Sequence, residues 1–307
     1  MKILIFGRDG QLGRELVKLY PQAQAVGRAE CDLLNLSALE QFLVSAAPDV
    51  IINASAYTAV DLAETNVDEA YGINCIAPQA MAAYAASHQI PFVHYSTDYV
   101  FDGEQSTPYI ETDDTHPLSV YGQSKLGGET AIEATCQAAG NPYYILRTSW
   151  VYGPTDGEGG NFVKTMLRLA RERDHLRVVA DQHGTPTSAA WLAAITQELL
   201  EKIPRVPSGI YHAVPRGETT WHGLATWVIE VARHAGADVQ VEHDQIEAIP
   251  ASSYPVPAPR PANSRLDHRR LLTALDQVAF PHWQEQVSAY VQDYVKNFIK
   301  VPPSIKG

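Results

Sequence analysis

The sequence predicts an α/β fold in which a doubly wound parallel sheet is joined by a smaller mixed lobe, formed mainly by the C-terminal part of the chain. Mainly apolar runs occur at residues 3–6, 49–53, 91–95 and 143–147, and such runs are typical of parallel strands buried on both faces. Stretches of helical character separate the runs, as βαβ crossovers require. A glycine-rich turn directly after the first run indicates where this sheet would bind a ligand.

The other elements of the sheet region follow in chain order. After the glycine turn we expect a helix, a short strand and the start of a second helix, at residues 11–19, residues 23–26 and about Ser37. An Ala-rich helix is expected over residues 67–87, with a kink or break at Pro78. The helix that precedes the last apolar run carries Tyr121 and Lys125.

The texture of the sequence changes after Tyr152, where a loop rich in glycine, proline and acidic residues begins. We expect a dinucleotide-binding domain over residues 1–152, joined by residues 175–214. The joining segment would add to the central sheet a strand at residues 176–180 and a helix at residues 188–202.

A substrate lobe is expected from the rest of the chain, over residues 153–174 and 215–300, with an amphipathic helix at residues 161–173. The proline-rich stretch at 250–261 has the composition of a surface loop, and residues 301–307 that of a loose tail.

Composition excludes several classes of protein. The 307 residues carry a net charge of −12 without a Lys/Arg-rich block, which argues against a nucleic-acid or anionic-membrane surface. The three cysteines are far apart and form no CxxC pair, so that neither a disulfide framework nor a structural zinc is expected. The apolar run after Lys2 is too short for a signal peptide or a membrane span, and we therefore expect a cytoplasmic protein.

Gly7, Gly10 and Gly13 lie between the first predicted strand and the first predicted helix. In a dinucleotide-binding turn the first glycine permits the tight turn, the second lets the backbone approach the pyrophosphate, and the third lets the helix pack on the strand. The spacing is GxxGxxG rather than GxGxxG, and a glycine-rich turn without a ligand would read the same way. The strand before it and the helix after it favour a Rossmann-like nucleotide site.

Two residues after the second strand bear on the choice of cofactor. Arg28 lies where a 2′-phosphate would be bound, which favours NADPH, although a solvated surface arginine would give the same sequence. Asp32 is a candidate for an adenine contact, and equally for the cap of the helix that begins near Ser37.

Tyr121 and Lys125 are four residues apart and would share one face of a helix, where a lysine ammonium lowers the pKa of a tyrosine and prepares it for proton transfer. Such a pair also occurs by chance, and it gains weight from its position. Ser96 and Thr97 follow the third apolar run, at the carboxyl edge where a doubly wound sheet binds its ligands. A hydroxyl there can bond a substrate carbonyl beside the tyrosine, although a Ser/Thr-rich turn is the alternative.

Taken together, these motifs resemble the extended short-chain dehydrogenase/reductases, and within them the dTDP-4-dehydrorhamnose reductase family. The resemblance covers residues 1–298 and includes stretches more specific than the superfamily motifs, at residues 94–101, 147–152, 161–168, 181–187, 219–222 and 260–267. It implies an NADPH-dependent reduction of the C4 keto group of a dTDP-linked 4-keto-6-deoxysugar, with NADH left open as a second cofactor.

The resemblance also implies roles for individual residues. Tyr121 would give the proton to the C4 oxygen, Lys125 would bind the nicotinamide ribose and lower the pKa of the tyrosine, and Thr97 would hold the reacting oxygen. The other residues implied to line the cofactor are Gly10, Gln11, Leu12, Asp32, Leu33, Ala56, Tyr57, Thr58 and Tyr95.

Three further residues are implied to contact the sugar nucleotide. Asp98 would lie in the sugar site and Trp150 would border the sugar, unless Trp150 is simply a core tryptophan. Arg260 could bind a nucleotide phosphate in bidentate fashion, and a salt bridge within the lobe is its alternative.

Some members of the family dimerise through a magnesium site built from glutamates. Glu15 matches one ligand position, whereas the position aligned with a second, within residues 187–191, carries alanine. We therefore assign no metal ligand and expect a solvated Glu15. Whether Mg²⁺ binds, and whether the chain forms a homodimer, stay open on the sequence alone.

Two other functions stay open on the sequence alone. The chain could reduce another nucleotide 4-keto-6-deoxysugar. It could also be a non-catalytic NADP-binding subunit, similar to the regulatory subunit of methionine adenosyltransferase. The complete set of Thr97, Tyr121 and Lys125 favours catalysis.

Overall fold

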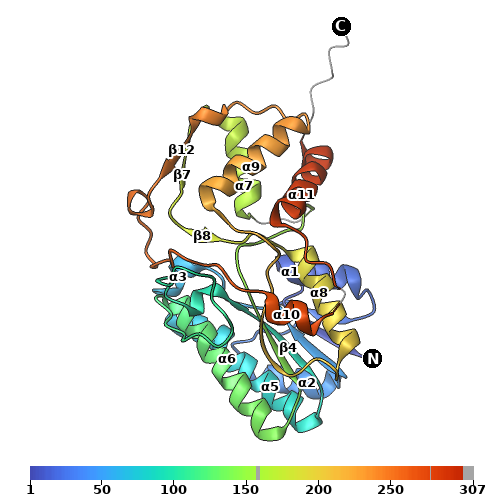
Figure 1. The fold of residues 1–307 in the computed structure, drawn as a ribbon. Coiled ribbons are helices and arrows are strands. Elements are labelled where there is room, and N and C mark those ends of the chain that lie inside the picture. Colours follow the sequence, from blue (N-terminus) through green and yellow to red (C-terminus); the bar gives the residue numbers. More distant parts are fainter. Residues whose placement is uncertain (157–159, 277, 300–307) are drawn as a thin grey trace.

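The computed structural model describes residues 1–156, 160–276 and 278–299. It consists of a sheet domain and a smaller lobe that is stacked on one end of it (Figure 1). The tail expected at residues 301–307 lies outside the described residues.

A six-stranded parallel sheet with the order β10-β5-β4-β3-β1-β2 forms the centre of the molecule. Its strands are β1 (Ile3–Phe6), β2 (Gln24–Val26), β3 (Val50–Asn53), β4 (Phe92–Thr97), β5 (Tyr143–Thr148) and β10 (Gly209–His212). From β1 the chain first runs outward to β2, and then returns to β3 on the other side of β1. The doubly wound sheet predicted from the sequence is confirmed, and its direction of winding reverses between β1 and β3.

Side chains of each strand contribute to two hydrophobic cores, one on each face of the sheet. In β1, Ile3 and Ile5 face a core that includes Leu16 of α1 (Gln11–Leu19) and Leu192 of α8 (Ala189–Lys202). The alternate residues of β1 face a second core, which is completed by α2 (Leu36–Ala46), α5 (Ala77–His88) and α6 (Val120–Ala139). Burial on both faces explains the continuous apolar runs in the sequence.

The strand expected at residues 176–180 exists but is not part of the central sheet. β7 (Leu176–Val179) pairs with β12 (Ile246–Ile249) in a separate parallel ribbon. The reason is visible in its pattern, since Arg177 is exposed between buried neighbours, whereas central strands are buried on both faces. The sixth central strand is β10, which we did not predict from the sequence.

The Ala-rich helix expected over residues 67–87 is a helix of three parts. A π-helical turn, η1 (Gly72–Ile76), separates α4 (Val67–Tyr71) from α5. Pro78 lies in the first turn of α5 and has no N–H to donate to the carbonyl of Asn74. The break therefore takes the form of a widened turn before the proline.

The lobe packs three helices around its own core and carries the β7–β12 ribbon. These helices are α7 (Phe162–Glu172), α9 (Trp221–His234) and α11 (Trp283–Phe298), and their core includes Val163, Leu167, Val228, Val287 and Val291. The shorter elements are α3 (Val60–Ala63), η2 (Asp98–Val100), β6 (Val151–Tyr152), β8 (His183–Gly184), β9 (Thr187–Ser188), β11 (Thr219–Thr220), η3 (His243–Gln245), η4 (Ala251–Ser253) and α10 (Arg269–Ala274). Apart from η4, residues 250–261 contain no helix or strand, as expected of a loop. Within the described ranges, no helix has the length and apolar character needed to cross a bilayer.

Helix α6 approaches η1 so closely that one of its glycines cannot carry a side chain. A Cβ built on Gly128 would lie 2.1 Å from the carbonyl oxygen of Asn74. A Cβ built on the adjacent Gly127 would meet only side-chain atoms, of which the nearest is the Cys75 Sγ at 3.1 Å.

We therefore predict that Gly128→Ala lowers the free energy of unfolding by about 2 kcal/mol, because the overpacking against backbone exceeds the ~1 kcal/mol that alanine gains in a helix. Urea denaturation measures the difference. Gly127→Ala is the matched control and should be neutral or slightly stabilising, since the Cys75 side chain can shift. Equal midpoints for the two variants would contradict the close approach.

Candidate active site

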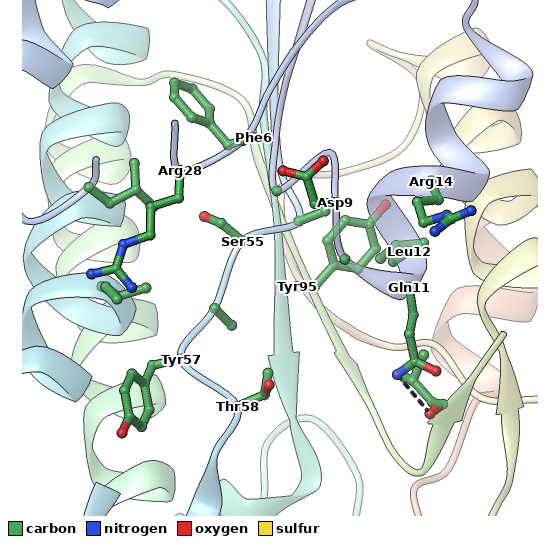
Figure 2. Close-up of a pocket in the computed structure, with 18 of the residues that line it drawn as sticks. Phe6, Asp9, Gln11, Leu12, Arg14, Arg28, Ser55, Tyr57, Thr58 and Tyr95 are labelled. Carbon is green, nitrogen blue, oxygen red and sulfur yellow. Dashed lines mark hydrogen bonds between the residues drawn. The ribbon is translucent and has the colours of Figure 1, made fainter. Parts of the chain in front are cut away.

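A cavity of about 680 Å³ opens at the carboxyl ends of β1 and β3, where the winding of the sheet reverses. Its walls are the glycine turn, the loop after β2, residues 54–59 after β3, the end of β4, and the first turns of α6. Figure 2 shows Arg28 and Tyr57 on one side of the segment that carries Ser55, with Gln11 and Leu12 on the other. The cavity is therefore located where parallel α/β sheets bind their ligands.

Most residues expected at the cofactor site line this cavity. They are Gly7, Gly10, Gln11, Leu12, Arg28, Asp32, Leu33, Ala56, Tyr57, Thr58, Tyr95, Tyr121 and Lys125. The expected residues that are not part of its lining are Gly13, Thr97, Asp98, Trp150 and Arg260.

The glycine turn has the geometry that a pyrophosphate needs. Gly7 has a φ of +85°, and a Cβ on it would come within 2.6 Å of the Ala54 carbonyl carbon. A Cβ on Gly13 would lie 1.9 Å from the Gly7 carbonyl oxygen, so only glycine lets α1 start this close to β1. Gly10 is the N-cap of α1 and offers no side chain to the first amides of the helix, which leaves these N–H groups for an anion. The turn thus fits the phosphates of a dinucleotide.

The acidic residue nearest the end of β2 is engaged within the protein. Both carboxylate oxygens of Glu30 accept hydrogen bonds from Arg8 Nη2, at 2.9 and 3.1 Å, and Oε2 also accepts one from the Gly27 amide at 3.0 Å. Arg28 lies on the cavity wall with 70% of its side chain exposed, and its Nη2 is 3.6 Å from Glu69 Oε1. This end of the cavity carries the Arg28 guanidinium beside the carboxylates of Glu69 and Asp32, and the guanidinium is a group that could bind a 2′-phosphate.

Asp32 does not cap the next helix. Its Oδ1 accepts a hydrogen bond from the Leu34 amide at 3.1 Å, and the side chain of Asn35 caps α2 instead. Of the two interpretations of Asp32, the cap is wrong, and the residue is available on the cavity wall.

Tyr121 and Lys125 are both in the cavity wall, one turn apart on α6. Lys125 is buried, and its Nζ donates to the Tyr95 carbonyl oxygen at 2.6 Å and lies 3.1 Å from His94 Nε2. Thr97 is at the end of β4 and makes a hydrogen bond with the Tyr121 hydroxyl. The tyrosine, the lysine and the threonine are thus brought together as the sequence predicts.

The predicted direction of the Tyr121 pKa is wrong. Burial raises the pKa of Tyr121 to about 12, although the hydrogen bond with Thr97 opposes the rise. Burial also lowers the pKa of Lys125 to about 8, against the effect of Glu129. Desolvation therefore outweighs the helical spacing, and Tyr121 keeps its proton at neutral pH.

Trp150 belongs to an aromatic stack at the junction with the lobe. Its ring is parallel to that of Trp221, with 3.7 Å between centroids and an angle of 15°. Its backbone has a φ of +48°, and Gly184 leaves room for the ring, since a Cβ there would lie 2.5 Å from Trp150 Cε2. The ring packs against the core of the lobe.

Arg260 links the lobe to the sheet domain rather than to another part of the lobe. Its Nη2 is 2.8 Å from Asp61 Oδ2 on α3, and Asp61 Oδ1 also accepts a hydrogen bond from the Ala258 amide. The alternative that we gave for Arg260 was a salt bridge within the lobe. A salt bridge is present, but its partner lies in the sheet domain, so that alternative is wrong as to the partner.

Glu15 is not the solvated residue that we expected. Only 13% of its side chain is exposed, and Lys18 Nζ lies 3.1 Å from its Oε1. Among the described residues, no group of three or more His, Cys, Asp or Glu side chains could hold a metal ion.

Sequence reasoning missed several residues of the site. Arg14 and Lys164 add positive charge to the cavity wall. Ser55 also lines the cavity, on the segment that follows β3 (Figure 2). Asn53 and His94 lie just behind the wall. For His94 the only local signal is a polar residue inside a buried strand.

Comparison with known proteins gives a consistent result. The family model described as RmlD substrate binding domain matches residues 1–296. A dTDP-4-dehydrorhamnose reductase of Burkholderia thailandensis is 41% identical over 302 residues, covering 95% of this chain and 99% of the relative.

Solved structures agree with this match. The crystal structure of a dTDP-4-dehydrorhamnose reductase from Clostridium acetobutylicum is 37% identical, with a TM-score of 0.84, over 96% of this chain and 100% of that one. A dTDP-4-dehydrorhamnose reductase from Bacillus anthracis, in complex with NADP, is 32% identical with a TM-score of 0.84, over 95% and 100% of the two chains.

The fold and the site define the class of this protein, which is a Rossmann-like oxidoreductase of the short-chain dehydrogenase/reductase type. The tyrosine–lysine pair on α6 and the glycine turn are its two landmarks. With the comparisons added, the chain belongs to the dTDP-4-dehydrorhamnose reductase family.

Asp98 gives a pH-dependent prediction. The residue is buried behind Thr97, whose Oγ1 donates to Asp98 Oδ1 at 3.1 Å, and burial raises the pKa of its carboxyl group from 3.8 to about 6. Stability from the protonated folded form is thus fully present below pH 3.8 and is lost as the pH rises to about 6.

We predict that Asp98→Asn, which cannot ionise, gains about 3 kcal/mol of stability over the wild type as the pH rises from 4 to 7. Urea denaturation at several pH values measures this gain. Asp244→Asn, at an exposed position of η3, is the control and should show no such gain. Parallel curves for Asp98→Asn and the wild type would show that the buried carboxyl does not titrate as stated.

Proposed function

We propose that this chain reduces the C4 keto group of dTDP-4-dehydro-6-deoxy-L-mannose with NADPH, giving dTDP-L-rhamnose, as the last step of dTDP-rhamnose biosynthesis. The observation that carries the proposal is the meeting of a protonated Tyr121, Thr97 and Lys125 at one end of a cavity that begins at the glycine turn. The names of the relatives, and the NADP in the Bacillus anthracis structure, support the substrate and the cofactor.

The cofactor would lie along the cavity, with its pyrophosphate on the amides of Gln11 and Leu12. Arg28 would bind the 2′-phosphate, and Asp32 and Leu33 would border the adenine. When bound, NADPH supplies the hydride. The geometry also leaves NADH as a weaker alternative.

Tyr121 would act as the proton donor in this site. Because its phenol is buried and protonated, it can give a proton to the C4 oxygen when that oxygen gains negative charge. Thr97 is bonded to the same hydroxyl and would hold the reacting oxygen, with Asp98 directly behind it. Lys125 would bind the nicotinamide ribose.

The sugar nucleotide would occupy the space between the sheet domain and the lobe. Trp150, together with its stacking partner Trp221, offers a flat apolar surface for a deoxysugar. Arg260 would bind a phosphate while Asp61 holds its guanidinium in place. In this division the dinucleotide-binding domain comprises residues 1–152 with α8 and β10 of the 175–214 segment, and the substrate lobe comprises residues 153–174 and 215–300 together with β7, which pairs with β12.

Two alternative functions are less well supported than this one. A reductase of another nucleotide 4-keto-6-deoxysugar would keep the same chemistry, but a dTDP-4-dehydrorhamnose reductase is 41% identical to this chain, against 36% for the spore coat polysaccharide biosynthesis protein SpsK of Bacillus subtilis. A non-catalytic NADP-binding subunit would have no need for a tyrosine, a lysine and a threonine arranged for proton transfer. The cytoplasm is the compartment that we propose, since the three cysteines are free thiols.

We predict that the protein oxidises NADPH when dTDP-4-dehydro-6-deoxy-L-mannose is added, and that Tyr121→Phe lowers kcat by about 10² or more because the proton donor is lost. Initial rates at 340 nm measure both. The Kd for NADPH should stay within about twofold of the wild type, which separates lost chemistry from lost binding. The absence of turnover in the wild type would reject the proposal, and turnover only with a different nucleotide sugar would favour the first alternative.

Cofactor choice gives a further prediction. Arg28→Ala should raise the KM for NADPH about tenfold and leave that for NADH nearly unchanged, because only NADPH carries the 2′-phosphate. Arg14→Ala is the matched control, since Arg14 also lines the cavity but lies on the opposite side from Arg28 (Figure 2). If Arg28→Ala affected the two cofactors equally, Arg28 would not be the residue that reads the 2′-phosphate.

A further inference from the structure

An aspartate of the glycine turn has no part in cofactor binding as described so far. Asp9 lies between Gly7 and Gly10 and lines the cavity, and 71% of its side chain is exposed. In Figure 2 its carboxylate points away from Gln11, the residue that begins α1. The turn that offers its amides to an anion therefore also carries a negative charge at the cavity wall.

The carboxylate of Asp9 stands at the end of β2. A Cβ built on Gly27, the first residue after β2, would collide with Asp9 Oδ2. Because Gly27 has no side chain, Asp9 can occupy the space beside the strand end. In dinucleotide-binding folds an acidic residue at this place accepts a hydrogen bond from the adenosine ribose. In this chain the acidic group comes from the glycine turn and not from the strand.

Arg8 holds one oxygen of this carboxylate and leaves the other facing Gly27. Arg8 Nε donates to Asp9 Oδ1 at 3.3 Å, and Arg8 Nη2 donates to Glu30 Oε1 at 2.9 Å. In the part of the chain that the structure describes, Asp9 Oδ2 accepts no hydrogen bond. Since two carboxylates share the guanidinium of Arg8, its charge does not cancel that of Asp9.

NADH and NADPH differ only at this ribose. The 2′-hydroxyl of NADH can donate a hydrogen bond to a carboxylate, whereas the 2′-phosphate of NADPH is an anion that a carboxylate repels. We propose that Asp9 is a specificity-determining residue, which accepts a hydrogen bond from the adenosine ribose hydroxyl of NADH and opposes the 2′-phosphate of NADPH.

This assignment deepens the proposed function and rests on it for the class of the cofactor. Arg28, the residue after Gly27, attracts the phosphate that Asp9 repels, and Arg28 is itself 3.6 Å from a carboxylate oxygen of Glu69. The two side chains thus act in opposite directions on the same group of the cofactor. The preference for NADPH is therefore smaller than Arg28 alone would give.

The first experiment removes the charge of Asp9 and keeps the shape of its side chain. In Asp9→Asn the Kd for NADPH should fall about fivefold because the repulsion is lost, and the Kd for NADH should rise about twofold because an amide oxygen accepts more weakly than a carboxylate. Titration of the full chain with each reduced cofactor, followed by cofactor fluorescence without a sugar nucleotide, measures both. A ratio of the two Kd values within twofold of the wild-type ratio would overturn the proposal.

Glu30→Gln is the matched control, because it removes a carboxylate that pairs with the same Arg8 but does not line the cavity. It changes the net charge of the chain by the same amount as Asp9→Asn. The ratio of the two Kd values should change by less than about twofold in this variant. An equal shift in both variants would assign the effect to Arg8 or to net charge, and the role given to Asp9 would be wrong.

The contact with the hydroxyl has a test of its own. An analogue of NADH that lacks the 2′-hydroxyl of the adenosine ribose should bind the wild type about fivefold more weakly than NADH, since a charge-assisted hydrogen bond is lost. In Asp9→Ala this difference should shrink to less than about twofold. Equal binding of the two compounds by the wild type, or a difference that persists in Asp9→Ala, would contradict the contact. These are binding measurements, so a lack of turnover would reject the proposed function and leave their outcome unaffected.

Discussion

One face of helix α6, and the buried ion pair that holds it against the sheet, determine how this wall of the cavity is arranged. Tyr121, Lys125 and Glu129 follow each other at intervals of four residues, and this face is buried against the sheet. Glu129 forms a bidentate ion pair with Arg147 of β5, at 3.0 and 2.7 Å, in which less than 4% of either side chain is exposed. Breaking such a pair by removing one partner typically costs about 3–5 kcal/mol, because it leaves an uncompensated buried charge. The ion pair thereby fixes the rotation of α6 about its own axis and its position along the sheet. The positions of Lys125 and Tyr121 in the cavity wall are set by these two quantities.

The cavity depends on a second constraint, which is backbone contact at the glycine turn. A Cβ on Gly13 would collide with the carbonyl oxygen of Gly7. Because glycine has no Cβ, α1 can start directly at the end of β1 with its first amides facing outward. The reversal of winding between β1 and β3 leaves the space above these amides open. The glycine turn thus presents outward-facing amides to the cavity, and α6 presents Tyr121 and Lys125 to the same cavity.

The sequence was sufficient for features that are local and strongly patterned. The buried strands β1, β3, β4 and β5, the glycine turn and the meeting of Tyr121 with Thr97 were all predicted, because each depends on a short motif or on strand ends that share one sheet edge. β10 was not predicted, since it begins with Gly209 and is defined by its pairing with β5.

Features that depend on the whole fold were predicted poorly. The spacing of Tyr121 and Lys125 gives their proximity but not their desolvation, which decides the direction of both pKa shifts. The partner of Arg260 is Asp61, almost two hundred residues earlier in the chain, and no local pattern connects them. The contacts of the buried His94 involve three elements at once, β3, β4 and α6.

The stack of Trp150 on Trp221 has an optical consequence. Two indole rings at 3.7 Å and nearly parallel are close enough for their excited states to couple, which gives an exciton couplet in the circular dichroism spectrum. Trp150 directly precedes Val151, a residue of the cavity wall, and Trp221 begins α9 of the lobe. The protein therefore contains a chromophore pair that joins residue 150, next to the cavity wall, to α9 of the lobe, and its spectrum would report the separation of the two rings without any added label.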